Sequence, residues 1–162
     1  MSDGMDAETV QQLTDLHYAY AAALDRLDPA ALRGVFHADA TLRVFEPDAD
    51  EPRSQASGHD QLVLMIDAMR ARYAKTMHVI TNITASALEL GTAAGRAYCV
   101  SHHLLRRDGP PAKFVMHLVY EDEFRCDPDD SWRIQQRDIR FQWAEESPVL
   151  PWPEALGRGG LG

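Results

Sequence analysis

The chain has 162 residues, the length of one ordinary domain, and its apolar share of 45% and charged share of 25% exclude a disordered chain and a membrane-embedded one. The formal net charge of −9 argues against nucleic acid as a partner, because a phosphate backbone is bound by a basic face and the arginines here are scattered. A small molecule or another protein is the expected partner.

The amino-terminal part of the chain is predicted to be helical. The start, MSDGMDAETV, has neither the basic segment nor the apolar stretch of a secretory signal, which predicts a cytoplasmic protein. Between residues 8 and 27 the apolar positions follow the three-and-four spacing of an amphipathic helix. Asp28 and Pro29 then supply an N-cap and a first helical position, which predicts a short second helix over residues 30–36.

The next segment is predicted to contain a brief strand, a loop and a third helix. Residues 41–45 favour the strand, and the polar, proline-containing run 46–58 favours a loop of the kind that forms a lid or a pocket rim. Residues 59–73 repeat at helical spacing with a methionine-rich face that includes Met65. That face either packs in the core or lines a soft-walled pocket.

The remaining pattern changes to a period of two and predicts a sheet. Four extended runs cover residues 76–90, 93–107, 113–125 and 132–143, and the breaks between them carry Gly, Pro and Asp. Consecutive antiparallel hairpins are expected, and helices followed by a meander predict an α+β fold. We expect a single domain over residues 1–162, with a core at about 7–143 and a tail at 147–162 that either lies over the domain or is frayed.

Three phrases of the sequence, in the same order, resemble the SnoaL-like branch of the nuclear transport factor two-like superfamily. These are YAAALDRLDPAALRGVFHADATL, TMHVITN and YEDEFRCDPDDSWRI. The resemblance covers about residues 7–143 and implies a cone-like curved sheet, closed by helices, around a deep pocket. The narrower similarity is to the scytalone dehydratase, bile-acid dehydratase and dehydrochlorinase subset, which implies that Asp25 orients His78. Tyr20 matches a tyrosine of the bile-acid dehydratase, whereas Ser101 stands where that enzyme has an aspartate.

A neutral histidine suits proton abstraction at neutral pH, and a carboxylate on its other ring nitrogen fixes the tautomer. We therefore expect His78 as the general base, Asp25 as its orienting residue, and Tyr20 as a hydroxyl donor to a departing group. The alternatives for these residues are a solvated helix-terminal carboxylate, a satisfied strand histidine, and a core tyrosine with a tethered hydroxyl.

The second long run has two parities, and the one with small residues is expected to face the pocket. It includes Ser101 and His103 as polar contacts, while His102 faces outward. His117 is either a pocket group or a surface residue, and one of Arg137 and Arg140 either anchors an anion or carbonyl or forms a surface ion pair. The expected substrate-binding residues are Ser101, His103, His117, Phe45, Met65, Arg140 and Trp143, with Phe141 as a further wall residue of the pocket or of an interface.

No cofactor is expected, because the chain has no phosphate loop or dinucleotide fingerprint. No metal is expected either, since the histidines lack carboxylates at ligand spacing, and Cys99 and Cys126 are expected to be reduced thiols. The outer face of the sheet is expected to carry Tyr98, Val100 and Tyr120, and its apolar character predicts a homo-oligomer, either a dimer or a trimer.

Two hypotheses of different classes follow from the sequence. The first is a cofactor-independent lyase, dehydratase-like, or an isomerase or cyclase, acting on an apolar oxygenated small molecule such as a polyketide or steroid. The second is a domain that binds a small molecule or assembles with a partner and performs no reaction. A hydrogen bond between Asp25 and His78 beside a sizeable cavity would favour the first hypothesis, and a cavity filled by side chains would favour the second.

Overall fold

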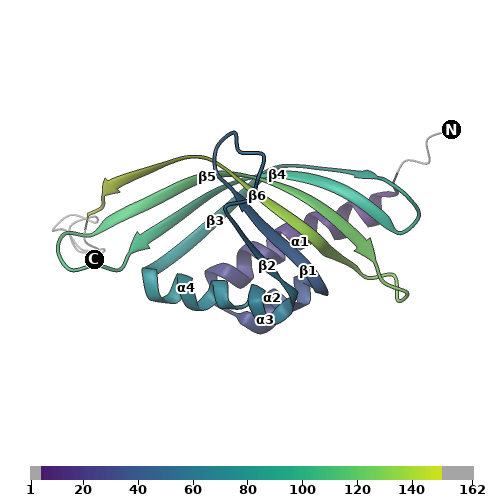
Figure 1. Ribbon diagram of the computed structural model, residues 1–162, viewed down its shortest axis with the longest axis horizontal. Coiled ribbons are helices and arrows are strands. Elements are labelled where there is room, and N and C mark those ends of the chain that lie inside the picture. Colours follow the sequence, from purple (N-terminus) through teal and green to yellow (C-terminus); the bar gives the residue numbers. More distant parts are fainter. Residues whose placement is uncertain (1–4, 151–162) are drawn as a thin grey trace, which may run out of the picture.

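A computed structural model describes residues 5–150, which form one six-stranded sheet and the helices that cover it. The strand order is β2-β1-β6-β5-β4-β3. Figure 1 shows a curved, open sheet with the helices on its concave side, so the α+β class predicted from the sequence is confirmed. In chain order the elements are α1 (Ala7–Asp25), α2 (Pro29–Val35), β1 (Phe36–Phe45), β2 (Ser54–Ser57), α3 (Gly58–Leu62), α4 (Leu64–Arg72), β3 (Tyr73–Ala87), β4 (Thr92–Leu105), β5 (Ala112–Cys126) and β6 (Trp132–Pro148).

Capping side chains determine where the first two helices begin. The Asp6 carboxylate accepts a hydrogen bond from the backbone N–H of Thr9 at 2.7 Å and so caps α1. The Asp28 carboxylate accepts from the backbone N–H groups of Ala30 and Ala31, both at 3.0 Å, which is the N-cap predicted for α2. Between the helices Leu27 has φ 52°, in the left-handed region, and this turn leaves Asp25 at the very end of α1.

The long strands pair as the sequence predicts, with one exception. β3, β4, β5 and β6 are successive antiparallel neighbours. β1, however, pairs in parallel with β6, where Val44 lies opposite Ile139. The expectation of a wholly antiparallel sheet is therefore wrong at this pair, which joins segments far apart in the chain and has no local sequence signal.

Several predicted segments have different bounds in the structure. The predicted loop 46–58 contains β2, which pairs with β1, and the predicted helix 59–73 is two helices separated at Val63. β1 begins at Phe36 instead of residue 41, because the second helix ends one residue before it. β6 continues to Pro148, so the predicted tail begins as strand, and its residues 151–162 lie outside the described part of the chain.

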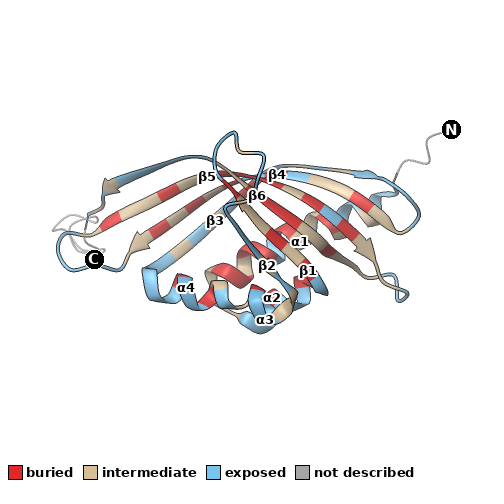
Figure 2. Cartoon of the chain, viewed as in Figure 1, coloured by how far each residue is buried: buried red, intermediate tan, exposed pale blue. Residues whose placement is uncertain are grey.

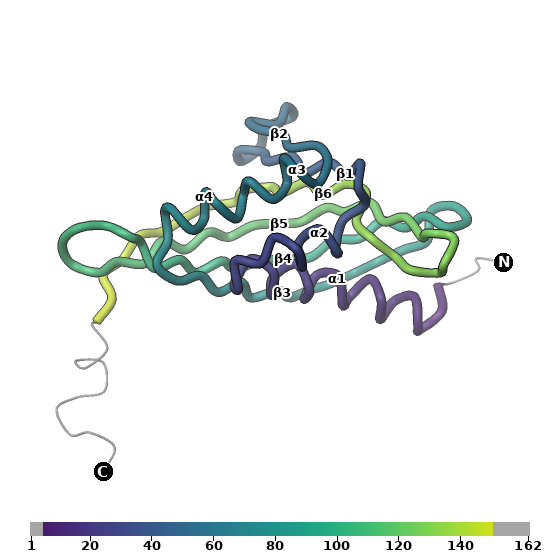
Figure 3. Tube along the Cα trace, turned by 90° about the horizontal axis from the view of Figure 1, so that it is seen from below, coloured from purple at the N-terminus to yellow at the C-terminus, as the bar shows by residue number. Residues whose placement is uncertain are grey.

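The core lies between the helices and the concave face of the sheet. Figure 3 shows α1, α2 and α4 lying across this face, and Figure 2 shows buried residues concentrated where the helices cover the strands. Fully buried side chains of both layers meet there, among them Leu13, Leu32, Ile66, Phe124 and Ile134. None of the described helices is both long and apolar enough to cross a membrane. Cys99 and Cys126 are free thiols.

Candidate active site

An aspartate and a histidine meet where the end of α1 reaches β3. The Nδ1 of His78 lies 2.6 Å from Oδ1 of Asp25 and donates to it, while the backbone N–H of His78 donates to Oδ2 at 3.0 Å. The Thr76 hydroxyl donates to Oδ1 at 2.9 Å. The structure thus brings together the two residues on which the predicted chemistry depends, and holds the carboxylate with several donors.

The surroundings of this pair keep the carboxylate ionised. Burial favours the neutral acid, but hydrogen bonds from His78 and Thr76 outweigh it, and the pKa of Asp25 lies below its ordinary value. The His78 side chain is only 5% exposed. Since Nδ1 is bound to the carboxylate, Nε2 is the ring nitrogen left for a ligand.

His78 faces a cavity of about 250 Å³ enclosed by α1, α4 and the concave face of the sheet. The wall is largely apolar, with methionine, leucine and aromatic side chains. Of the predicted site residues, Tyr20, Met65, His78, Ser101 and His103 line it, as does Phe141; the other lining residues are Leu24, Val44, Ala68, Met69, Arg72, Tyr73, Met116, Leu118, Tyr120 and Ile139. Asp25 lies behind His78 and does not itself line this cavity.

Two polar side chains of the cavity wall have no hydrogen-bond partner among residues 5–150. Oγ of Ser101 and both ring nitrogens of His103 are buried without hydrogen bonds. The His103 ring stacks on Tyr73, with 4.0 Å between centroids, and meets the His78 ring edge-on at 5.5 Å. Burial, and next the neighbouring His78, lower the pKa of His103 to about 4, so its ring is neutral. An unpartnered buried polar group costs about 1–3 kcal/mol, and a ligand that pairs with these groups recovers that cost.

Tyr20 forms part of the cavity wall, and its hydroxyl lies 4.0 Å from Sδ of Met65. Burial raises the pKa of Tyr20 above its ordinary value, so the phenol stays protonated and remains a donor. Its ring packs edge-on against Tyr120, with 5.7 Å between centroids. The expectation that Tyr120 faces outward is therefore wrong, since it points into the concave side and is 1% exposed.

A buried ionic network lies behind the two tyrosines. Arg137 makes a two-pronged ion pair with Asp122, at 2.8 and 2.6 Å, and donates to Nδ1 of His17 at 3.0 Å. Its guanidinium lies 4.2 Å from the centroid of the Tyr20 ring and 4.4 Å from that of Tyr120. Arg137 therefore supports the cavity wall from behind and does not line the cavity. Its pairing with Asp122 and His17 was not predicted, because no local spacing relates the three.

His117 and Trp143, expected as substrate contacts, lie on the outer face of the sheet instead. Their rings stack there with 4.3 Å between centroids. The physical reason is a bulge: the β5 and β6 register places Trp143 opposite His117 but Phe141 opposite Leu118, so Gln142 is an extra residue. Phe141 consequently faces the cavity and Trp143 the other side, which simple alternation does not foresee.

Phe45 and Arg140 are likewise on the outer side. They are register partners of the parallel β1 and β6 pair, and the Arg140 guanidinium lies 4.3 Å from the centroid of the Phe45 ring. Arg140 also forms an ion pair with Glu121. Their assignment as cavity contacts is wrong, because the unforeseen parallel pairing sets the face on which they lie.

Thr76 is a site residue that the sequence reasoning missed. It stands two positions before His78 on one strand, so both side chains point to the same face. The same alternation that predicted the inward orientation of Ser101 and His103 would have placed the Thr76 hydroxyl beside Asp25.

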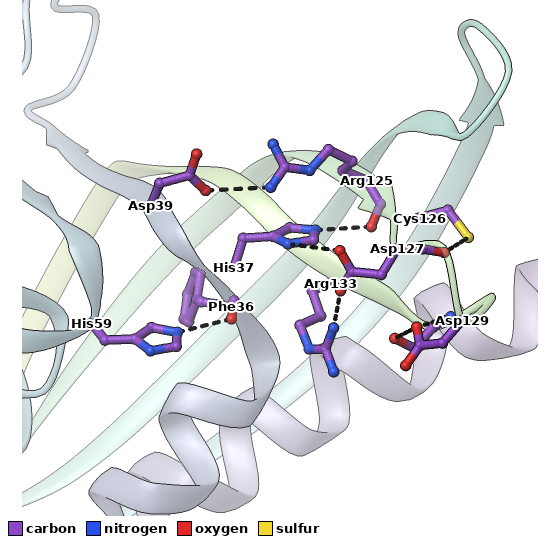
Figure 4. Close-up of polar contacts among 10 residues, drawn as sticks. Phe36, His37, Asp39, His59, Arg125, Cys126, Asp127, Asp129 and Arg133 are labelled. Atoms are coloured by element: carbon purple, nitrogen blue, oxygen red, sulfur yellow. Dashed lines mark hydrogen bonds and ion pairs between the residues drawn. The ribbon is translucent and has the colours of Figure 1, made fainter.

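A second polar cluster lies where β1 meets the turn between β5 and β6 (Figure 4). His37 is only 5% exposed; its Nδ1 is 3.5 Å from Oδ1 of Asp127, and its Nε2 donates to the backbone carbonyl of Arg125 at 3.0 Å. Asp127 also pairs with Arg133, and Arg125 with Asp39. Nε2 of His37 is thus occupied by a backbone carbonyl and is not free for a ligand. Within residues 5–150 no group of three or more His, Cys, Asp or Glu side chains could hold a metal ion.

Solved structures with a similar fold include a candidate dehydratase and a dehydrochlorinase. A candidate scytalone dehydratase from Novosphingobium aromaticivorans is 18% identical, with a TM-score of 0.72 over 86% of this chain and 88% of that one. A hexachlorocyclohexane dehydrochlorinase of the LinA type from Novosphingobium barchaimii is 15% identical, with a TM-score of 0.73 over 88% and 90%. A candidate aromatic ring hydroxylase from N. aromaticivorans is 24% identical, with a TM-score of 0.73 over 90% and 96%.

At these identities the similarity establishes the fold alone. No curated protein matches the sequence. The SnoaL-like domain family, in contrast, matches residues 5–138, which span most of the chain and carry both Asp25 and His78. The protein therefore belongs to the SnoaL-like domain family.

Proposed function

We propose that this protein is a cofactor-independent lyase or isomerase that acts on an apolar oxygenated small molecule, with His78 as the general base. One observation carries the proposal: Nδ1 of His78 is 2.6 Å from the Asp25 carboxylate, while the ring lines a largely apolar cavity of about 250 Å³. A histidine held in one tautomer beside a largely apolar cavity is suited to move a proton.

In the proposed reaction Nε2 of His78 removes a proton from a carbon that neighbours a carbonyl or a leaving group. The imidazolium that forms is stabilised by Asp25, whose lowered pKa keeps it a carboxylate at neutral pH. The electron pair of the broken C–H bond forms a new double bond. Either an oxygen function then departs, with Tyr20 as its proton donor, or the proton returns at another carbon.

The cavity favours a small, neutral and mostly apolar substrate. Its volume lies just below the roughly 300–1,000 Å³ typical of sites for drug-sized ligands, which supports a compound of one or two rings over a steroid. The unpartnered Ser101 hydroxyl and neutral His103 ring are suited to hold a carbonyl or hydroxyl oxygen of that compound. Met65, on the opposite wall, gives an adaptable apolar contact.

The proposal is tested by proton exchange. One- and two-ring ketones are incubated in deuterated water with the protein, and loss of the α-proton signal is followed by NMR. We expect exchange that is saturable and is abolished by His78→Gln, while His37→Gln exchanges as the unmodified protein does. Equal exchange by His78→Gln with an intact fold rejects the proposed base. Tight binding of such ketones without exchange supports the binding-only alternative.

A homo-oligomer formed through the outer face of the sheet is also proposed. Large apolar side chains are exposed there, with Met77 63%, Trp143 57%, Val79 41% and Tyr98 40% accessible. Light scattering after gel filtration tests this. A dimer or trimer that Trp143→Glu dissociates is the expected result, and a monomer at all concentrations contradicts it.

A further inference from the structure

The cations that lack an ionic partner gather at one end of the molecule. Within residues 5–150 most arginines lie within 4.0 Å of a carboxylate. The lysines and arginines that do not are Arg26, Arg72, Lys75, Arg106 and Lys113. In a chain of net charge −9, where acids outnumber bases, unpaired cations at one place are unexpected from composition.

Four of these five cations lie at the inner cavity that contains His78 or beside residues that line it. Arg72 lines the cavity, with its guanidinium 5.5 Å from the centroid of the Tyr73 ring. Arg106 donates to the backbone carbonyl of Tyr73 at 3.3 Å. Lys75 and Lys113 line a second hollow, a groove of about 740 Å³ at the end of β3 and β4.

The groove and the inner cavity are neighbours, because Tyr73 and His103 line both. The strand register orders the groove further: Lys75 lies opposite Leu104, and Leu104 opposite Lys113. The two lysines therefore flank Leu104 in one row, with backbones two strand spacings or about 10 Å apart. Lys75 alternates with Met77, and Lys113 with His117, so both lysines project from the outer face of the sheet close to the ends of their strands. A chain that leaves the inner cavity past Tyr73 therefore reaches this pair of ammonium groups around the ends of β3, β4 and β5.

The groove carries little negative charge of its own. Asp25 is the one carboxylate among its described lining residues, and its oxygens already accept hydrogen bonds from Thr76 and His78. The ammonium groups of Lys75 and Lys113 are thus available to an anion. Unpaired cations at a cavity mouth raise the local concentration of anionic ligands and speed their entry.

We propose that this groove binds an anionic group, a carboxylate or a phosphate, on the tail of the ligand whose apolar part fills the inner cavity. Lys75 and Lys113 contact the anion, and Arg72 lies at the passage between the two compartments. The inference deepens the proposed function, and rests on it only in taking the inner cavity as the reaction site. The ligand is therefore amphipathic, with a ring to be deprotonated at one end and a charge at the other.

The test compares two fluorescent probes of nearly equal shape, anionic 8-anilino-1-naphthalenesulfonate and neutral N-phenyl-1-naphthylamine. Lys75→Gln/Lys113→Gln is matched with Arg33→Gln/Arg53→Gln, which removes the same net charge from exposed positions outside both hollows. The lysine variant should bind the anionic probe about 3–10-fold more weakly, the range expected for two partly exposed charge pairs. The neutral probe and the arginine variant should bind as the unmodified protein does. If both variants weaken the affinity for the anionic probe equally, or neither does, the proposed anion site in the groove is rejected.

Displacement of the neutral probe identifies the anion. Octanoate and octyl phosphate should displace it at lower concentrations than octanol. Whichever of the two anions binds more tightly identifies the anionic group as a carboxylate or a phosphate. In the lysine variant the anions should displace the probe no better than octanol. Octanol displacing as well as both anions contradicts the proposal. Probe binding needs no turnover, so the probe titrations and the proton-exchange assay measure the groove and the base separately. If probe binding does not depend on the lysines but exchange depends on His78, the groove proposal is rejected and the proposed base stands. If exchange does not depend on His78 but anion binding depends on the lysines, the base is rejected and the groove stands.

Discussion

Two histidine and aspartate pairs in this protein differ in whether the second ring nitrogen of the imidazole is free to bind a ligand. His78 gives Nδ1 to Asp25 and keeps Nε2 toward a largely apolar cavity. In His37, Nδ1 faces Asp127 and Nε2 is hydrogen-bonded to a backbone carbonyl. This ring lies beside a hollow lined by arginines and aspartates. The comparison teaches that an aspartate beside a histidine does not make a base. A free nitrogen and a water-poor space on its far side are also needed.

The largest expected difference between the pairs is in the histidines themselves. His78→Gln should lower turnover by about 10²–10⁴-fold, the range that loss of a general base typically costs. His37→Gln should retain turnover within about twofold. A change of that size means that His37 does not stabilise the transition state. The rate of α-proton exchange measures both. Comparable losses in the two variants would show that the two histidines do not differ in function.

Substitution of the two aspartates should also affect the rate differently, and the difference should be smaller than for the histidines. Asp25→Asn should lower the rate about 10²–10³-fold, because the amide neither stabilises the imidazolium nor fixes the reactive tautomer. Asp127→Asn should leave the rate unchanged and lower the free energy of unfolding by about 1 kcal/mol, since it weakens contacts to Arg133 and His37. Urea titration beside the exchange assay gives both quantities. A rate loss in Asp127→Asn would show that the second cluster acts on the reaction.

Low pH should destabilise the protein through histidines that the fold keeps neutral. Burial lowers the pKa of His17 to about 3 and that of His103 to about 4, against an ordinary value of 6.5. Below pH 6.5 these histidines therefore bind protons in the unfolded chain but remain unprotonated in the native state. Stability should be full above that pH and fall as the pH decreases, to about pH 4 for His103 and about pH 3 for His17, by up to about 1.4 kcal/mol per pH unit for each histidine.

His103→Gln checks this attribution, because it removes one of the two protons. Its unfolding free energy, measured in urea from pH 7 to 4.5, should fall less steeply than that of the unmodified protein, by about 1.4 kcal/mol per pH unit at most. An unchanged slope would mean that His103 is protonated in the folded state, and would remove the neutral hydrogen-bonding role proposed for it.

The smallest expected effect concerns the second support of each carboxylate. Thr76→Val removes the hydroxyl that donates to Asp25 but leaves His78 in place, and should lower the exchange rate about 3–10-fold, equivalent to one hydrogen bond. Arg133→Gln removes the matching support of Asp127 and should not change the rate. A Thr76→Val rate equal to that of the unmodified protein would show that His78 alone positions Asp25.

The pair at the end of α1 was predictable because its two members lie in phrases that resemble a known family. The inward set of β4, with Ser101 and His103, was predictable from alternation alone, since that strand has no bulge between these positions. Helix caps such as Asp28 were equally visible, because a cap acts over two or three residues. Local physics therefore gave the elements and part of the cavity wall.

What could not be predicted depends on contacts between distant segments. Trp143 and Phe141 exchange faces because of one extra residue in β6, and Phe45 and Arg140 follow from a parallel pair that only the folded sheet defines. The burial of Arg137 needs Asp122 and His17 from other elements. In each case the deciding partner is remote in sequence, so neither periodicity nor spacing contains it.

The parallel pairing of β1 with β6 has a consequence for biosynthesis. During translation β1 emerges long before the strand that must lie beside it, and its inner edge stays without hydrogen bonds until β6, Trp132–Pro148, has left the ribosome. Contacts of such long sequence separation close late and fold slowly. The nascent chain thus carries an unpaired strand edge for most of its synthesis, and chaperones that shield such edges are expected to raise its yield.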